Sequence, residues 1–246
     1  MGEIIKYYIN IIDMKAFITF GAGGQNYKDA CSRLTRQASQ MNVFDKITSF
    51  SDNDLKEDNE FWLKHSEFIL KNKRGYGNWL WKPYLIKKQM EQMKDGDILL
   101  YLDAGCELDI RKRDLMIEYF SIIKKDLIIG TTTRFIEKHY TKMDLFIELD
   151  LATDTYFDSK QRQGGVNMFY VCEDVRKLVD EWYRISSIYN LLDFSKGNNA
   201  NSPDFKEHRN DQSIFSLLTK KYNIFSEISL LPVVEVLRNR TGKSKL

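Results

Sequence analysis

Asp103 is the side chain whose place in the sequence points most directly to chemistry. It follows the apolar run 98–102, and Gly105 comes two residues later. Such a run predicts a central strand covered on both faces, and ligands of open α/β sheets bind beyond the carboxyl ends of the strands. Asp103 is therefore a candidate to bind a cation or a polar substrate. A carboxylate that only caps a turn closed by Gly105 explains the same residues equally well.

The segment 73–84, KRGYGNWLWKPY, brings aromatic rings, glycines and positive charge together upstream of Asp103. Sugars stack on aromatic rings, and cationic side chains bind diphosphates. Arg74, Trp81 and Lys82 are therefore candidate contacts to a nucleotide-sugar. The alternative is an aromatic plug in the core with its charges in solvent.

Two further glycine-containing stretches could approach a ligand. The predicted strand 15–20 runs into Gly-Ala-Gly-Gly and then a predicted helix, an arrangement that favours phosphate binding. The spacing differs from the dinucleotide-binding fingerprint, because Asn26 stands where its third glycine is expected. Gly164 and Gly165 precede another apolar run, and they would let the backbone come close to a ligand.

The segment 208–213, HRNDQS, opens a predicted helix. Asp211 fits an N-cap, a position where aspartate is favoured. The same placement would also direct Asp211, Gln212 and His208 into a crevice, and the spacing does not decide between these interpretations.

Composition restricts the class of protein. The 246 residues are 43% hydrophobic, which is enough for a sizeable core, and no low-complexity linker divides them, so we expect a single domain, 1–246. The 37 basic and 35 acidic residues are interspersed, which argues against a nucleic-acid binder. Three separated cysteines predict free thiols and a cytoplasmic protein. Residues 1–14 form a predicted lead-in rather than a signal peptide, and 237–246 form a basic tail.

The elements expected to position these residues alternate between strand and helix. Apolar strands around Phe17, Ile98, Ile128 and Met168 are separated by amphipathic helices. This alternation predicts an α/β fold of three layers, with a mostly parallel central sheet flanked by helices.

The order of motifs resembles a known family. FGAGG, GYGNWLWKPYLI, GDILLYLDAGCE, GGVNMFYV and HRNDQSIFSLL occur in this order. The sequence resembles glycosyltransferases with the GT-A nucleotide-diphospho-sugar fold, including members from large DNA viruses and bacterial polysaccharide clusters. The resemblance spans about 15–236 and implies transfer of a sugar from a nucleoside diphosphate, such as a UDP-sugar, to a hydroxyl of a glycan or other acceptor, with retention. For a viral member it implies the host cytoplasm.

The resemblance also implies roles for individual residues. Asp103 matches the first aspartate of the DxD motif that holds Mn²⁺ or Mg²⁺, but Gly105 replaces the second acid, so Glu107 or His208 would have to complete the metal shell. Asp211 and Gln212 are the candidate catalytic residues. The candidate donor-binding residues are Thr19, Phe20, Gly21, Ala22, Arg74, Trp81, Lys82, Asp103, Ala104, Gly105, Gly164 and Gly165.

Two other functions remain open at this point. The incomplete DxD motif also fits a non-catalytic module that binds a nucleotide-sugar. A Rossmann-type NAD(P)-dependent oxidoreductase is less favoured, because the glycine spacing is broken.

Overall fold

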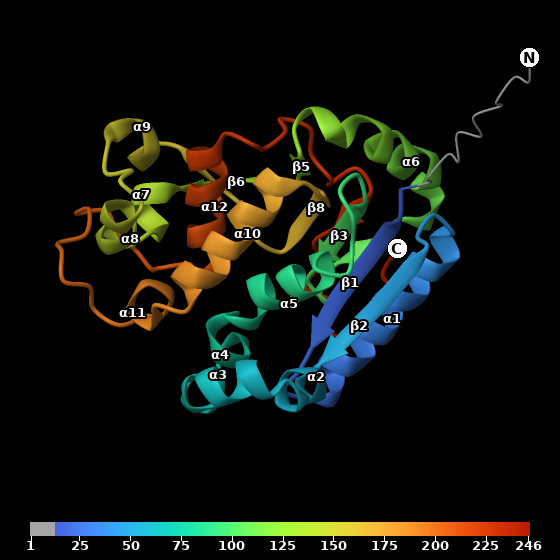
Figure 1. Cartoon of the computed structure of the whole chain (residues 1–246), viewed down its shortest axis with the longest axis horizontal. Coiled ribbons are helices and arrows are strands. Elements are labelled where there is room, and N and C mark those ends of the chain that lie inside the picture. The colour runs from blue at the N-terminus through green and yellow to red at the C-terminus, as the bar shows by residue number, and fades with distance from the viewer. Residues whose placement is uncertain (1–12) are drawn as a thin grey trace, which may run out of the picture.

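A five-stranded sheet forms the centre of the molecule (Figure 1). The computed structural model describes residues 13–246, so the predicted lead-in falls outside the described residues except for its last two positions. The strands lie in the order β2 (Lys46–Ser51), β1 (Lys15–Gly21), β3 (Ile98–Leu102), β8 (Val166–Tyr170) and β5 (Ile128–Ile129). The four strands predicted around Phe17, Ile98, Ile128 and Met168 are all present in this sheet.

The sheet is mixed, which corrects the prediction of a mostly parallel one. β1 pairs in parallel with both β2 and β3, whereas β8 runs antiparallel to β3 and to β5. Between β3 and its neighbour β8 the chain forms β4 (Glu107–Leu108), α6 (Arg113–Ile122), β5 and the separate pair of β6 (Thr132–Ile136) with β7 (Lys160–Arg162). β8 therefore enters the sheet from that pair rather than by a simple strand-helix-strand crossover.

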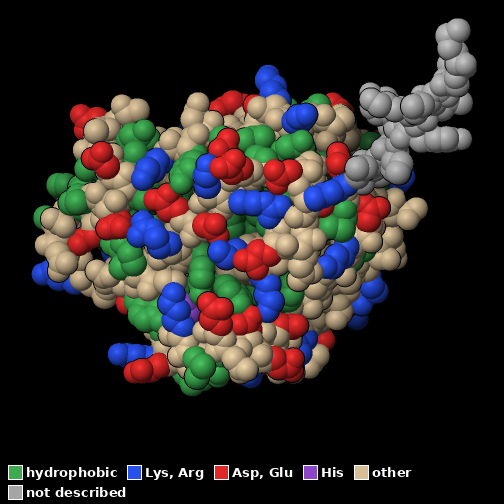
Figure 2. All heavy atoms as spheres, in the orientation of Figure 1, with side chains coloured by type: hydrophobic (Ala, Val, Ile, Leu, Met, Phe, Trp, Pro, Cys, Tyr) green, Lys and Arg blue, Asp and Glu red, His purple; other side chains and the backbone are tan. Residues whose placement is uncertain are grey.

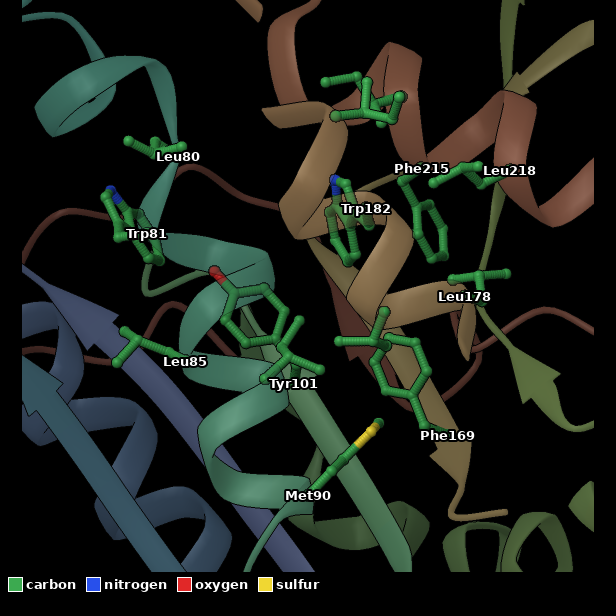
Figure 3. Close-up of a cluster of buried hydrophobic side chains, with 14 of the residues drawn as sticks. Leu80, Trp81, Leu85, Met90, Tyr101, Phe169, Leu178, Trp182, Phe215 and Leu218 are labelled. Atoms are coloured by element: carbon green, nitrogen blue, oxygen red, sulfur yellow. The ribbon is translucent and has the colours of Figure 1, made fainter. Parts of the chain in front are cut away.

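Helices cover both faces of the sheet, as the strand and helix alternation predicted. Side chains alternate along β1, so that Ile18 packs with one group of helices and Phe17 with the other. The first group is α3 (Asn59–Lys71), α5 (Trp81–Met90), α10 (Glu173–Ser186) and α12 (Asn210–Tyr222). Core side chains of α5, α10 and α12 lie around Tyr101 and Phe169 in Figure 3. The second group is α1 (Gln25–Met41) and α6 (Arg113–Ile122).

Shorter elements complete the described chain. They are α2 (Asp52–Glu57), α4 (Gly75–Asn78), α7 (Glu137–Tyr140), α8 (Met143–Glu148), α9 (Asp154–Phe157) and α11 (Tyr189–Leu192), with 3-10 turns at Ile110–Lys112 and Ile123–Lys125. Two small sheets pair β4 (Glu107–Leu108) with β9 (Val234–Glu235) and β6 (Thr132–Ile136) with β7. β4 begins four residues after Asp103, so the C-terminal part of the chain returns to the end of β3.

The C-terminal tail is anchored beside the turn that contains Asp103. The buried guanidinium of Arg33 donates hydrogen bonds to the carbonyl oxygens of Ala104, Cys106 and Asn239. Asn239 N–H donates to Gly105 O at 2.9 Å, and a Cβ on Gly105 would lie 3.1 Å from Arg238 Cα. The predicted basic tail is therefore packed against the Asp103 turn along part of its length.

The segment that leads into α5 has an unusual backbone. Five consecutive residues, 75–79, have positive φ angles, and three of them are not glycine. A left-handed backbone costs a non-glycine residue about 1–2 kcal/mol. Here it is supported by hydrogen bonds from Asn78 N–H to Arg74 O and from Trp79 N–H to Gly75 O. This turn sets the position at which α5 starts.

Replacing Gly77 by Ala should destabilise the protein more than replacing Gly23. Both glycines have φ near +85°, but a Cβ on Gly77 would lie 2.6 Å from Cγ1 of Ile69, whereas nothing lies within 4 Å of one on Gly23. We expect the free energy of unfolding to fall by about 2–4 kcal/mol for Gly77→Ala and by about 1–2 kcal/mol for Gly23→Ala, because only the first adds a clash to the backbone strain. Chemical denaturation measures both, and equal losses would contradict the close packing of α4 on α3.

The surface and the cysteines agree with the composition. Lys, Arg, Asp and Glu side chains are interspersed on the face in Figure 2. Cys31, Cys106 and Cys172 are free thiols, as predicted from their number and spacing. Among residues 13–246, no helix is long and apolar enough to cross a membrane.

Candidate active site

Asp103 lies directly beyond the end of β3, at the carboxyl edge of the sheet. Its N–H donates to Gly165 O at 2.8 Å, and its carbonyl accepts from Cys106 N–H at 2.9 Å. These two bonds fix the backbone, so both the sheet and the predicted turn contribute to its position. The side chain is 40% exposed and is open to a ligand.

The Lys82 ammonium lies between the carboxylates of Asp103 and Asp211. Lys82 Nζ is 3.3 Å from Oδ1 of Asp103 and 2.7 Å from Oδ2 of Asp211. The side chains of Lys82 and Asp211 are only 3% and 5% exposed. The Asp211 contact departs from hydrogen-bond geometry, so we describe it as an ion pair. Three elements thus bring one buried cation and two acids together: α5, the end of β3 and the start of α12.

Tyr101 completes this group, and it was missing from the candidates named from the sequence. Its hydroxyl donates to Oδ1 of Asp103 at 2.6 Å, and its ring centroid lies 5.6 Å from Lys82 Nζ. Residues two apart in a strand point to the same side of a sheet, and Tyr101 stands two positions before Asp103. That spacing is the signal from which Tyr101 could have been found.

The electrostatics of the group follow from its burial. Burial opposes the charge on Lys82, but Asp103 and Asp211 outweigh it and raise the lysine pKa above its usual value. Burial also raises the pKa of Asp211 to about 6, although Lys82 opposes this, and Asp103 adds to the rise. Burial and the Asp103 carboxylate together raise the pKa of Tyr101, which therefore remains a hydrogen-bond donor.

The paired glycines lie against both carboxylates. A Cβ on Gly165 would collide with Oδ2 of Asp103, and one on Gly164 would lie 3.2 Å from Oδ2 of Asp211. The sequence predicted that these glycines let the backbone approach a ligand. In the structure they let it approach Asp103 and Asp211, so their role is to make room for the two acids.

Gln212 and Asp211 begin α12 but point into the protein. Gln212 Nε2 donates to Oε1 of Gln161 at 2.9 Å. The carbonyl of Asp211 accepts from Trp182 Nε1 at 3.1 Å, and the Asp211 residue is 3% exposed. Asp211 is therefore too enclosed for direct contact with a ligand, and it would act on one only by positioning Lys82 and, through Lys82, Asp103.

The structure does not bring Glu107 and His208 to Asp103 as a metal shell, which corrects that expectation. Buried Glu107 accepts hydrogen bonds from Gln37, Asn239, Ser244 and the N–H of Lys245. These bonds hold the pKa of Glu107 at about 2, although burial alone would raise it. Buried His208 accepts from Lys142 N–H and donates to Leu191 O, and burial lowers its pKa to about 3.

Several residues expected to bind the donor are internal. Thr19 is fully buried and donates to Leu102 O at 2.8 Å, and Phe20 stacks on Trp81 with ring centroids 3.9 Å apart. Trp81 Nε1 donates to Gly75 O at 2.9 Å. A Cβ on Gly21 would lie 2.6 Å from Cys31 Sγ, so this glycine permits close packing of α1. Phe20 and Trp81 thus form the aromatic plug that was the alternative, and Ala22 and Ala104 are buried as well.

Two arginine side chains gather around the carboxylate of Glu207. Arg74 is 61% exposed and stacks over Phe194, with its guanidinium 3.9 Å from Glu207. Arg209, which was not among the sequence candidates, lies 3.2 Å from the same carboxylate and stacks on Phe135. Burial lowers the pKa of Arg209, whereas the Glu207 carboxylate raises it. The positive charges of Arg238 and Arg74 lower this pKa further, so the three arginines are near one another.

The donor set does not fit a divalent cation held by protein. Mg²⁺ and Mn²⁺ prefer several oxygen ligands. The two acids here share the Lys82 ammonium, and in 13–246 no three His, Cys, Asp or Glu side chains come together as a metal site.

Two open surface hollows lie away from this group of residues. One has a volume of about 700 Å³ and is lined by Tyr183 among others, and the second has a volume of about 380 Å³ and is lined by Lys88 among others.

The chain has similar solved structures but no matching family model. No family model matches the sequence, and no curated protein matches it. The structure is similar to apo mouse xyloside xylosyltransferase 1, with 11% identity, a TM-score of 0.45, and coverage of 89% of this chain and 86% of that one. It is also similar to the apo bifunctional glycosyltransferase WbbM, with 13% identity, a TM-score of 0.42, and coverage of 91% of this chain but only 39% of that one. Both TM-scores are below 0.5, so neither similarity establishes the fold or the function.

Proposed function

We propose that this protein is a glycosyltransferase that moves a sugar from a nucleoside-diphosphate donor, such as a UDP-sugar, to a hydroxyl of a glycan or other acceptor, with retention. The observation that carries the proposal is the exposed Asp103 carboxylate at the carboxyl edge of the sheet, ion-paired to buried Lys82 and hydrogen-bonded by Tyr101. Sugar transfer needs such a group, because the anomeric carbon becomes positively charged as its bond to the diphosphate breaks.

Asp103 is the acid that would face the anomeric carbon. Of the two carboxylates in the group, Asp103 is 40% exposed, whereas the Asp211 side chain is 5% exposed. Lys82 and Tyr101 keep the Asp103 side chain oriented, and Asp211 positions Lys82. This assignment moves the principal catalytic role from Asp211 to Asp103 and makes Asp211 a positioning residue.

The arginines are the candidates to bind the leaving diphosphate. Negative charge accumulates on the leaving phosphate, and planar guanidinium groups bind phosphate oxygens through paired hydrogen bonds. Arg74 and Arg209 both contact Glu207 in the free protein, and a diphosphate would replace this single carboxylate with more negative charge. With retention, the acceptor hydroxyl attacks from the side of the leaving group, and the departing phosphate oxygen takes its proton.

A panel of donors tests the proposal. UDP-sugars and GDP-sugars are incubated with the full chain, and release of free nucleotide is measured beside calorimetric binding of UDP, GDP and NAD. We expect slow hydrolysis of at least one nucleotide-sugar, because water can replace the acceptor. Nucleotide-sugar binding without turnover would instead support the binding module, and binding of NAD alone would support the oxidoreductase.

A further inference from the structure

The cation at the centre of the candidate active site belongs to the protein itself. Lys82 Nζ contacts carboxylates from two different elements, at 3.3 and 2.7 Å, and its side chain is 3% exposed. Lys82 also stands in the first turn of α5, where the helix dipole disfavours a positive charge. A lysine buried there is accounted for by its two acidic partners, Asp103 and Asp211.

We propose that the Lys82 ammonium takes the place of a divalent ion between Asp103 and Asp211, so that a nucleoside diphosphate binds this protein without added metal. The part about the two acids stands on the contacts alone. The part about the diphosphate rests on the proposed function. The proposal as a whole departs from the expectation that Asp103 would hold Mn²⁺ or Mg²⁺.

The oxygens of both acids already have protein neighbours. Oδ1 of Asp103 forms an ion pair with Lys82 and accepts a hydrogen bond from the hydroxyl of Tyr101. Oδ2 of Asp103 lies against Gly165. Oδ2 of Asp211 faces Lys82, and this carboxylate is enclosed by the protein. A divalent ion beside these oxygens would be repelled by the ammonium at short range, and in low dielectric this repulsion is strong. The negative charge that would attract metal is therefore largely compensated.

Removing the Lys82 ammonium should create a site that binds a divalent ion. In Lys82→Met the methionine keeps much of the stem, while Asp103 and Asp211 lose their shared counter-charge. Two adjacent carboxylates without a cation are a suitable oxygen pair for Mn²⁺, and more ligand charge gives tighter binding. We therefore expect Lys82→Met to gain a Mn²⁺ site that wild-type protein lacks.

Lys142→Met is the matched control. The Lys142 side chain is also 3% exposed, but its Nζ contacts one carboxylate, Asp193 at 3.4 Å, and the carbonyl of Asn190 at 2.7 Å. Its removal frees a single acid, so no Mn²⁺ site should appear. The double variant Lys82→Met/Asp103→Asn should lose the site gained by Lys82→Met, because one of the two carboxylates is gone.

The experiment titrates Mn²⁺ alone into these proteins by calorimetry, and follows the melting temperature with and without Mn²⁺. We expect Mn²⁺ to bind Lys82→Met about tenfold more tightly than wild type, or more. Among the four proteins, Mn²⁺ should raise the melting temperature of Lys82→Met alone. A Lys82→Met protein that folds only with Mn²⁺ gives the same result in stronger form. Equal Mn²⁺ affinity in wild type and Lys82→Met, or a variant that stays unfolded with Mn²⁺, would overturn the inference.

A second titration uses wild-type protein only and so does not depend on how the variants fold. UDP and GDP are titrated with EDTA and then with Mn²⁺. We expect affinities that agree within about threefold, because Lys82 already balances the two acids and the arginines supply the positive charge for the diphosphate. A rise of more than about tenfold with Mn²⁺ would overturn the second part. No nucleotide binding in either medium would count against the proposed function, while the Mn²⁺ titration of Lys82→Met would still test the role of Lys82.

Discussion

Replacing Asp103 by Asn should lower the rate of donor turnover by about 10²–10³-fold, because it removes the exposed carboxylate that we propose to face the anomeric carbon. The amide keeps the shape of the side chain but not its charge. The loss should appear mainly in kcat, since charge on the anomeric carbon develops only in the transition state. Steady-state kinetics with the donor found in the panel measures this change.

The matched control for this prediction is Asp109→Asn. Asp109 lies near Asp103 in the chain, but its carboxylate pairs with Arg111 at 2.7 Å, outside the Asp103, Lys82 and Asp211 group. Its replacement should leave turnover within about twofold of wild type, because it touches no reacting atom. Circular dichroism should show both variants folded. Full activity in Asp103→Asn would exclude Asp103 from the chemistry and leave it a turn residue.

Much of the fold could be predicted because burial leaves a clear pattern in the sequence. The apolar run before Asp103 became β3, with every residue buried, and the strands predicted around Phe17 and Met168 are β1 and β8. These elements follow from hydrophobic periodicity, which is local. Strand direction is not local. The antiparallel course of β8 is set by how the chain between β3 and β8 packs, and a continuous apolar run has the same appearance in either direction.

The site could be predicted only in part, for the same reason. Asp103, Lys82 and Asp211 were each recognised as candidates, because charged side chains at element ends are conspicuous. Their pairing through one ammonium joins residues 129 positions apart, and no spacing rule specifies it. Glu107 was expected to bind metal, but its carboxylate is taken by Asn239 and other groups of the tail. Contacts over such distances in sequence depend on the packing of the whole chain.

Replacing Asp211 by Asn should stabilise the protein at pH 7 while lowering its activity. Burial raises the pKa of Asp211 to about 6, against about 3.9 in an unfolded chain, so the fold favours the neutral form. Two pH units correspond to about 3 kcal/mol, and we expect Asp211→Asn to gain about 1–3 kcal/mol in the free energy of unfolding. Turnover should fall because Lys82 loses a partner and no longer holds Asp103 in place.

The pH dependence gives this prediction a definite sign. A carboxyl whose pKa is raised on folding contributes stability that is fully present below about pH 4, where both states are protonated, and that is lost as the pH rises through about 6. Asn does not titrate. The gain of Asp211→Asn over wild type should therefore be small at pH 4, grow between pH 4 and 6, and stay constant above.

Asp144→Asn provides the opposite case. Asp144 is also buried, but its carboxylate accepts hydrogen bonds from the N–H groups of Asn198 and Asn199. Burial would raise its pKa, but these bonds outweigh burial and lower it. Asp144→Asn should therefore lose stability at pH 7, by about 1–3 kcal/mol. Urea denaturation of both variants at pH 4, 5, 6 and 7 measures the two trends. A loss of stability in Asp211→Asn at pH 7 would show that the ion pair with Lys82 outweighs the cost of burying the Asp211 charge.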